Sequence, residues 1–170
     1  FESEKIEKPW AATGWDGSRP RAIINSLYIK PDVLEQHNLR LEAKYRVMRE
    51  EETMVDLQYM EDAEYAVCAY GTTGRIALTA VRRARAEGIK VGLIRPITVW
   101  PFPEKEIAEI AKRVKSILTV EMSMGQMVDD VRLAANGACP VLFHGRTGGM
   151  IPGVNEILGK IRQMKGGAGA

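Results

Sequence analysis

Cysteine is scarce in this chain of 170 residues, which contains only Cys68 and Cys139. Each lies alone inside an apolar run and lacks the spacing of metal ligands, so a disulfide scaffold and a zinc ribbon are excluded. Histidine is as rare, and neither His37 nor His144 has the serine, cysteine or carboxylate neighbours of a catalytic triad or metal site. We interpret the cysteines as reduced core thiols of a cytoplasmic protein and both histidines as structural.

Long hydrophobic runs and a one-sided charge are also absent. No apolar run approaches the length that a bilayer-spanning helix needs, and residues 1–5 lack the basic and apolar regions of a signal peptide. The 24 Lys and Arg residues against 22 Asp and Glu give a net charge of +2, with the basic residues spread along the chain. The sequence therefore predicts neither a membrane nor a nucleic-acid partner. A start at Phe1 rather than Met fits a piece of a longer protein.

The composition that remains is that of a globular protein, with 45% hydrophobic and 27% charged residues. The length suits one domain with an appendage. Residues 1–30 are rich in Trp, Pro and Gly without a sustained period, which predicts an extended docking arm. Its Trp10 and Trp15 either cover an apolar surface of another domain or subunit or fold back onto this chain. Residues 31–52 are charged with a narrow apolar stripe and predict a connector helix.

The segment 53–165 has the pattern of an α/β domain. A loosely alternating stretch at 53–60 predicts an edge strand, and a nearly continuous apolar run at 63–70 predicts a strand buried on both faces. Further strands at 91–94, 116–120 and 140–143 alternate with amphipathic helices. This alternation predicts an open parallel sheet covered by helices on both faces. The Gly/Ala tail at 166–170 is expected to be disordered.

Chemistry on such a sheet is expected in the loops beyond the carboxyl ends of the strands. The stretch 71–75 offers backbone N–H groups at a helix start, the hydroxyls of Thr72 and Thr73, and the cation of Arg75. It could hold a phosphate or a carboxylate, or it could be a tight turn with a threonine cap. It lacks the ending of a P-loop and the glycine spacing of a dinucleotide fingerprint.

Charged residues end two other predicted strands. Glu121 and Arg95 predict an ion pair at the rim of the sheet, with an acid or base role for Glu121 as the alternative. Arg146, between glycines of the stretch 145–149, either approaches an anion or only marks a turn. Met122, Met124 and Met127, in the loop that follows Glu121, fit an adaptable contact surface or core filling.

Four stretches, taken in order and spacing, resemble the C-terminal part of the alpha-type subunit of 2-oxoacid:ferredoxin oxidoreductases. The resemblance is greatest to the 2-ketoisovalerate (3-methyl-2-oxobutanoate) branch, with 2-oxoglutarate or pyruvate as alternative substrates. The four stretches are Ala69-Tyr70-Gly71-Thr72-Thr73-Gly74-Arg75, Gly92-Leu93-Ile94-Arg95-Pro96-Ile97-Thr98-Val99-Trp100-Pro101-Phe102-Pro103, Val120-Glu121-Met122-Ser123-Met124-Gly125-Gln126-Met127 and Gly145-Arg146-Thr147-Gly148-Gly149.

The resemblance implies oxidative decarboxylation of a 2-oxoacid on thiamine diphosphate and Mg²⁺, electron transfer through iron-sulfur clusters to ferredoxin, and acyl transfer to coenzyme A. It also implies a transketolase C-terminal-like domain with a five-stranded sheet of order 1-3-2-4-5, whose first strand is antiparallel. The implied partners are a thiamine-diphosphate-binding beta subunit, a gamma subunit, a ferredoxin-like delta subunit and ferredoxin itself. The resemblance also implies that the protein is cytoplasmic.

Departures from the family pattern limit the expected role of this chain. Residues 14–17 are not the Gly-Asp-Gly motif, with its downstream Asn, that holds Mg²⁺, and no cysteine cluster exists for iron and sulfur. We therefore expect no catalytic residue, metal or cofactor in this chain, which would serve as an inactive scaffold and interface. The alternative of another class is a free-standing phosphate- or nucleotide-binding module built on residues 71–75.

The strand order implied by the family predicts where the functional surface lies. It places the loops that begin at Gly71 and Glu121 on either side of the point where the chain reverses direction across the sheet. We expect six residues of these strand ends to lie together and to contact a partner domain or an anionic group of coenzyme A. They are Thr72, Thr73, Arg75, Arg95, Glu121 and Gln126.

Overall fold

The computed structural model describes residues 6–167 and divides the chain into two compact units, residues 1–43 and 44–170. The boundary falls inside the first helix, α1 (Pro31–Glu51). Residues 1–5 of the predicted arm and 168–170 of the predicted tail lie outside the described residues. Among the described residues, no helix is long and apolar enough to cross a bilayer.

The first unit holds the arm, which forms neither helix nor strand over residues 6–30. A local turn is stabilised by the Trp15 indole N–H, which donates to the carbonyl oxygen of Arg19 at 2.8 Å. The Arg21 guanidinium lies 4.4 Å from the centre of the Trp15 ring, a cation–π distance. Trp10 and Trp15 nevertheless remain 67% and 54% exposed. Among the described residues of the arm, both rings therefore keep more than half of their surface exposed.

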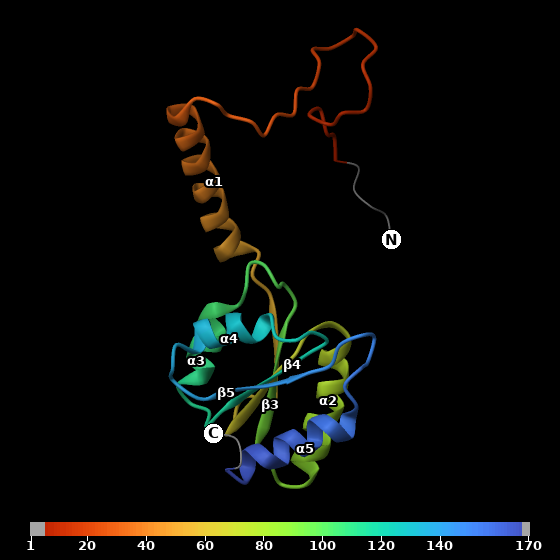
Figure 1. The fold of residues 1–170 in the computed structure, drawn as a ribbon, viewed down its shortest axis with the longest axis vertical. Helices are drawn as coiled ribbons and strands as arrows, with labels where there is room; N and C mark the ends of the chain where they lie inside the picture. The colour runs from red at the N-terminus through yellow and green to blue at the C-terminus, as the bar shows by residue number, and fades with distance from the viewer. Residues whose placement is uncertain (1–5, 168–170) are drawn as a thin grey trace. The chain divides into compact units, whose positions relative to one another are not determined.

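The second unit contains a five-stranded sheet of order β1-β3-β2-β4-β5 (Figure 1). The first strand runs antiparallel to β3, and the other neighbours are parallel. The sheet therefore has the strand order and the antiparallel edge that the resemblance implied. The strands are β1 (Val55–Gln58), β2 (Tyr65–Cys68), β3 (Val91–Pro96), β4 (Ile117–Glu121) and β5 (Val141–Gly145).

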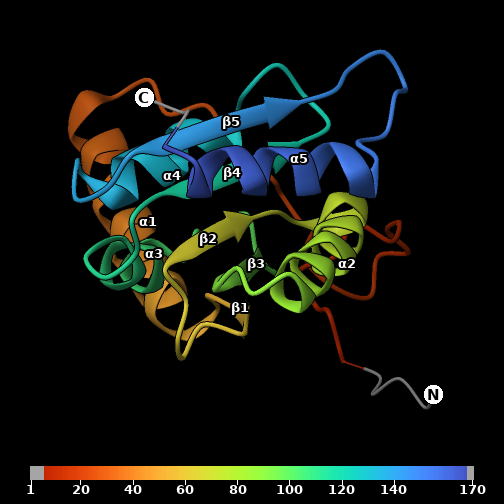
Figure 2. The same cartoon turned by 90° about the horizontal axis from the view of Figure 1, so that it is seen from below.

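Helices cover both faces of the sheet and confirm the three-layer α/β/α fold (Figures 1 and 2). On one face lie α2 (Gly71–Ala86) and α5 (Val154–Lys165), and on the other lie α3 (Glu104–Ala111) and α4 (Met127–Ala135). Side chains alternate between the two cores, because successive residues of a strand point to opposite faces. In β4, Leu118 joins the core under α2 and α5, whereas Ile117 joins the core under α3 and α4.

Small residues set the close approach of α2 to the sheet. Ala77, Ala80 and Ala84 have no exposed surface and recur on the inner face of this helix. The helix α3 ends at Ala111, earlier than its periodic pattern, which continues to Val114. Val114 is still buried, because the chain continues in a turn over the same core.

Candidate functional site

The candidate site is the edge of the sheet at which the four parallel strands end. The loops after β2, β3, β4 and β5 leave from this edge, and the antiparallel β1 begins there. The loop after β3 is tied to the start of β1 by Thr98, whose Oγ1 accepts the N–H of Met54 at 3.0 Å and donates to Pro101 at 2.9 Å. This tie holds the loop of residues 97–103 over the sheet edge.

Glu121 ends β4 as a buried carboxylate that caps helix α4. Its side chain is 1% exposed, and it accepts the backbone N–H groups of Gln126, Met127 and Val128 at 3.2, 2.8 and 2.9 Å. The Ser123 hydroxyl donates to the same carboxylate at 3.1 Å. Free N–H groups and the positive end of the helix dipole stabilise a negative charge at such a position. Glu121 therefore has a structural function that needs no cation.

The expected ion pair between Arg95 and Glu121 is wrong. Arg95 lies 3.7 Å from Asp56 of β1, the residue directly opposite it in the antiparallel register. Cross-strand neighbours of opposite charge lie close enough to interact, whereas Glu121 is occupied by the start of α4. The Arg95 side chain also passes the first turn of α2, since its Cδ would lie 3.5 Å from a Cβ at Gly74. Arg95 thus lies beside residues 71–75, the first turn of α2, as expected. Its ion-pair partner, however, is Asp56 rather than Glu121.

The start of α2 lacks a side-chain cap. Its N-cap residue is Tyr70, which has extended backbone angles and makes no capping hydrogen bond. The Thr73 hydroxyl donates to the carbonyl oxygen of Tyr70 at 2.6 Å, so the predicted threonine cap is wrong. Thr72 and Arg75 are exposed on the first turn. A helix start of this kind leaves backbone N–H groups free for an anion, and the exposed cation of Arg75 belongs to the same turn.

Gln126 and Tyr70 line one small cavity of about 200 Å³ together with Met127 of α4. Val99 and Phe102 of the loop after β3, and Asp130 of α4, complete its wall. The loops after β2 and β4 therefore meet here, at the point where α2 and α4 leave on opposite faces of the sheet. Crevices at such a reversal are the usual ligand sites of open α/β sheets.

Arg146 follows β5 and is held by two interactions. Its backbone N–H donates to the carbonyl oxygen of Glu121 at 3.1 Å, and its guanidinium donates to Glu156 at 2.9 Å. Glu156 accepts the N–H of Gly153 at the start of α5, and His144 Nε2 lies 3.4 Å from it. The Gly153 N–H, followed by Arg146 and His144, lowers the pKa of Glu156. Arg146 is thus part of a structural cluster at the α5 start.

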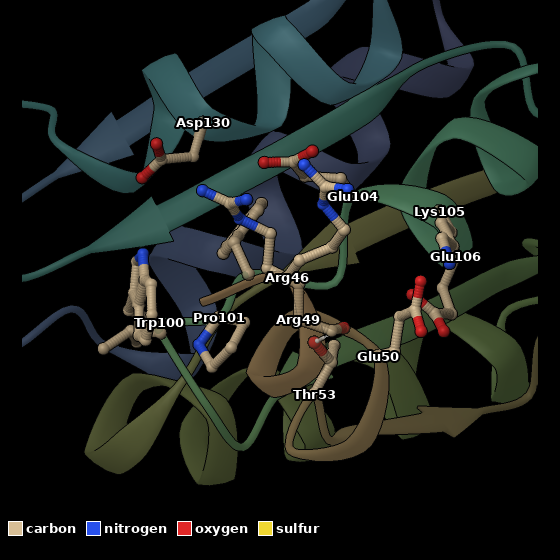
Figure 3. A pocket seen from close by; sticks show the side chains of 12 residues that line it. Arg46, Arg49, Glu50, Thr53, Trp100, Pro101, Glu104, Lys105, Glu106 and Asp130 are labelled. Atoms are coloured by element: carbon tan, nitrogen blue, oxygen red, sulfur yellow. Dashed lines mark hydrogen bonds between the residues drawn. The ribbon is translucent and has the colours of Figure 1, made fainter. Parts of the chain in front are cut away.

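A larger cavity of about 370 Å³ lies beside the loop after β3 (Figure 3). Arg46 of α1, Glu104 of α3 and Asp130 of α4 come from three helices and line it with Trp100 (Figure 3). The Trp100 ring meets Tyr45 of α1 edge-on, with 5.4 Å between ring centres. Sequence reasoning missed this hollow, because it forms only where the end of α1 meets the loop. The one available signal was the exposed aromatic within a proline-rich loop.

The loops at this edge expose large apolar side chains. Met124 is 83% exposed and Met122 is also exposed, whereas Met127 is buried, so core filling holds for Met127 alone. Every loop of the edge contributes at least one such residue. We call this set the apolar rim; its members are Met54, Tyr70, Ile97, Val99, Trp100, Met122, Met124, Met150 and Ile151.

Among residues 6–167, no group of three or more His, Cys, Asp or Glu side chains is placed to hold a metal ion. Cys68 and Cys139 are free thiols buried under α3 and α4. Burial, and secondarily the charge of Glu121, raises the pKa of the Cys68 thiol. These thiols are inert core residues rather than ligands or nucleophiles.

The fold and its loop edge are those of an open α/β domain whose loops at the carboxyl ends of the strands form the candidate site. Residues 63–157 match the family described as pyruvate:ferredoxin oxidoreductase core domain II, and the chain belongs to this family. The family resemblance of the four loop stretches is thereby confirmed.

Relatives in the same family are much longer than this chain. The ketoisovalerate oxidoreductase subunit VorB of Methanothermobacter marburgensis is 40% identical over 92% of this chain, and that of Methanothermobacter thermautotrophicus is 40% identical over 98%. These matches cover 44% and 48% of the two relatives, so the chain spans about half of their length. The 2-oxoglutarate synthase subunit KorA of M. marburgensis is also 40% identical, over 71% of this chain and 32% of its own.

A solved structure with the same fold is the 2-oxoglutarate:ferredoxin oxidoreductase from Magnetococcus marinus, described with 2-oxoglutarate, coenzyme A and succinyl-CoA bound. It superposes with a TM-score of 0.67 over 81% of this chain and 24% of that chain. The sequence identity is 16%, so this likeness concerns the fold alone.

Proposed function

We propose that this chain is the core domain II of the alpha-type subunit of a 2-ketoisovalerate:ferredoxin oxidoreductase. The complex would decarboxylate 2-ketoisovalerate oxidatively to its acyl-CoA and pass the electrons to ferredoxin. The coverage of the relatives supports this branch, because the identity to the VorB subunits extends over 92% and 98% of the chain. The match to KorA stops at 71%.

Within that complex, the domain acts as a scaffold whose apolar rim contacts another domain or subunit. The apolar rim carries this proposal, because scattered apolar residues are normal on a surface but a set gathered on every loop of one edge indicates a contact site. Trp, Tyr and Met are among the residue types enriched in protein interfaces. Candidate occupants are the beta, gamma and delta subunits and the part of the longer relatives that this chain does not cover.

Thiamine diphosphate, Mg²⁺ and iron-sulfur clusters fit poorly to the residues of this chain. The two thiols are buried and do not form a cluster, and the described carboxylates do not gather into a metal site. We therefore assign these cofactors to the rest of the complex and expect the isolated chain to be inactive. An anionic group of coenzyme A would meet the start of α2, near Arg75, rather than any metal ligand.

Assembly and turnover of the complex test the role of the apolar rim. We expect Trp100→Ser and Met124→Ser to weaken association with the other subunits, and Arg75→Ala and Gln126→Ala to lower turnover, while the melting temperature of the isolated chain changes little. Leu133→Ser is the matched control, because Leu133 is exposed on α4 outside the rim. Unchanged association and turnover in all four rim and loop variants would contradict the proposal.

The substrate is tested separately with the reconstituted complex. Ferredoxin reduction is followed with 2-ketoisovalerate, 2-oxoglutarate and pyruvate, each with coenzyme A. We expect the highest kcat/KM for 2-ketoisovalerate. A higher value for 2-oxoglutarate would reject the branch and leave the scaffold role in place.

A phosphate-binding module is the second candidate, favoured by the uncapped start of α2. Calorimetric titration of the isolated chain with inorganic phosphate and with AMP distinguishes it from the scaffold. Saturable binding that is lost in Arg75→Ala would support the module.

A further inference from the structure

The two edges of the sheet differ in how they are protected. The edge strand β1 has only four residues, and two of them, Asp56 and Gln58, are polar and hydrogen-bonded to each other at 2.7 Å. The opposite edge strand, β5, reads Val-Leu-Phe-His-Gly and contains no Asp, Glu, Lys or Arg. All five residues are only partly buried, and β5 is the outermost strand on this side of the sheet (Figure 2). Proteins often protect edge strands with charged side chains, and β5, which is one residue longer than β1, has no such charge.

Alternate residues of β5 point their backbone groups away from the sheet. The carbonyl oxygen of Pro140 accepts the N–H of Ile117 at 3.0 Å, and the N–H of Arg146 donates to Glu121 at 3.1 Å. Even-numbered residues of this stretch therefore face β4, since N–H and C=O of one residue point the same way in a strand. Val141, Phe143 and Gly145 face outward. Within residues 6–167, their N–H and C=O groups have no hydrogen-bond partner.

We propose that β5 pairs antiparallel with β5 of a second copy of this chain, about a two-fold axis at Phe143. Phe143 would then exchange two hydrogen bonds with Phe143 of the second copy. Val141 of each copy would exchange two with Gly145 of the other. The pairing satisfies all three free N–H groups and all three free C=O groups of each strand, and the two sheets become one sheet of ten strands.

The free edge is self-complementary, which favours a second copy over a strand of another protein. Its three outward residues are arranged symmetrically about Phe143, so a two-fold axis leaves no group unpaired. The cross-strand pair of Phe143 rings adds apolar contact, and the absence of charged side chains in β5 removes like-charge repulsion. Two-fold pairing also uses both β5 edges, so the assembly closes as a dimer rather than extending.

Sedimentation velocity and amide hydrogen exchange on the full 170-residue chain test this pairing. We expect a dimer in which the amides of Val141, Phe143 and Gly145 become protected as the protein concentration rises. A chain that stays monomeric, with these amides exchanging at the rate of free groups, would overturn the proposal. A dimer in which the three amides remain unprotected would overturn it as well, because another surface would then mediate the association.

Val141→Pro tests the outward hydrogen bonds of β5 without disturbing its hydrogen bonds to β4. The Val141 N–H points outward, so proline removes a donor to the second copy and leaves the bonds to β4 intact. We expect the dimer dissociation constant to rise about tenfold or more. Leu57→Pro is the matched control, because the Leu57 N–H faces outward from β1, and it should leave dimerisation unchanged.

Phe143→Lys provides a second variant in case the proline variant does not fold. It keeps the backbone donor but places two cations opposite each other at the axis, so we expect monomers with the circular dichroism spectrum of the parent chain. A Phe143→Lys chain that remains dimeric would contradict the two-fold at this residue. Protection of the three amides only after other subunits are added would reject the second copy as the occupant.

Discussion

At the scale of single residues, Glu121 shows that backbone N–H groups at a helix start can stabilise a buried carboxylate without a cationic side chain. A carboxylate that is 1% exposed is costly unless it is paired or hydrogen-bonded. Three backbone N–H groups of α4 and the hydroxyl of Ser123 provide those bonds. Because the N–H donors lie five to seven residues after Glu121, the carboxylate ties the end of β4 to the start of α4 across the intervening loop.

Removal of this cap tests its contribution to stability. Glu121→Ala leaves the N–H groups of Gln126, Met127 and Val128 without their acceptor, and we expect the free energy of unfolding to fall by about 2 to 3 kcal/mol. Urea unfolding followed by circular dichroism measures the change. The control is Glu109→Ala, which breaks an exposed pair with Lys112 and should cost less than about 0.5 kcal/mol. Equal effects of the two substitutions would contradict the capping role.

The lowered pKa of Glu156 predicts how the stability of the folded chain depends on pH in acid. Hydrogen bonding to Gly153 and the charges of Arg146 and His144 lower its pKa below the ordinary value of 4.5. A depressed carboxyl pKa stabilises the folded state at pH values above the unfolded pKa, and this stabilisation is lost as the pH falls through the folded pKa. We expect Glu156→Gln to lower the melting temperature at pH 7, and this difference from the parent chain to shrink as the pH falls below 4.5 and through the lowered folded-state pKa of Glu156.

At the scale of elements, a glycine permits the close approach of β3 and the turn after β1. A Cβ at Gly92 would lie 2.1 Å from the Sδ of Met60 and 2.8 Å from the backbone oxygen of Tyr59. Side chains and backbone of that turn therefore fill the space that any other residue would occupy. Gly159 of α5, by contrast, has open space at the same position.

These two glycines give substitutions of opposite sign. Gly92→Ala forces the backbone at Tyr59 to move, and we expect a loss of about 1 to 3 kcal/mol in unfolding free energy. Gly159→Ala should stabilise by about 0.5 to 1 kcal/mol, because alanine has less freedom in the unfolded chain and favours a helix. Thermal and urea unfolding of both variants check the signs. A stable Gly92→Ala chain would show that the β1 turn is mobile.

At the scale of the whole molecule, the two units differ in how much of their chain has regular secondary structure and a hydrophobic core. The second unit contains both hydrophobic cores, whereas residues 6–30 of the first unit have no regular structure and expose most of their large apolar side chains. We therefore propose that the arm docks on another domain or subunit, which would cover these apolar side chains.

Limited proteolysis distinguishes the two units. We expect the first cuts within residues 6–30, while the segment from α2 to α5 resists, because few contacts hold the backbone of the arm. Fluorescence should show red-shifted emission that iodide quenches, since Trp10, Trp15 and Trp100 are all more than half exposed. A protected arm with blue-shifted emission would indicate that it folds back onto the chain.

The local sequence pattern was sufficient to predict the strands and helices of the second unit. Apolar runs and helical periodicity predicted five strands and their connecting helices, since both signals depend on residues near one another in the chain. The strand order and the antiparallel β1 followed from the family resemblance rather than from pattern. The end of α3 at Ala111 was not predicted, because the periodic pattern continues through the turn that follows it.

The sequence by itself determined the α/β class, the buried alternation of the strands and the loops that meet at the carboxyl edge, because these depend on local periodicity and on the rule that parallel strands end together. Tertiary structure alone decided which charged groups pair. Arg95 met Asp56 across the antiparallel β1, and Glu121 met the N–H groups of α4. The cavity beside Trp100 and the free edge of β5 were likewise decided there, because each depends on which segments distant in the sequence become neighbours.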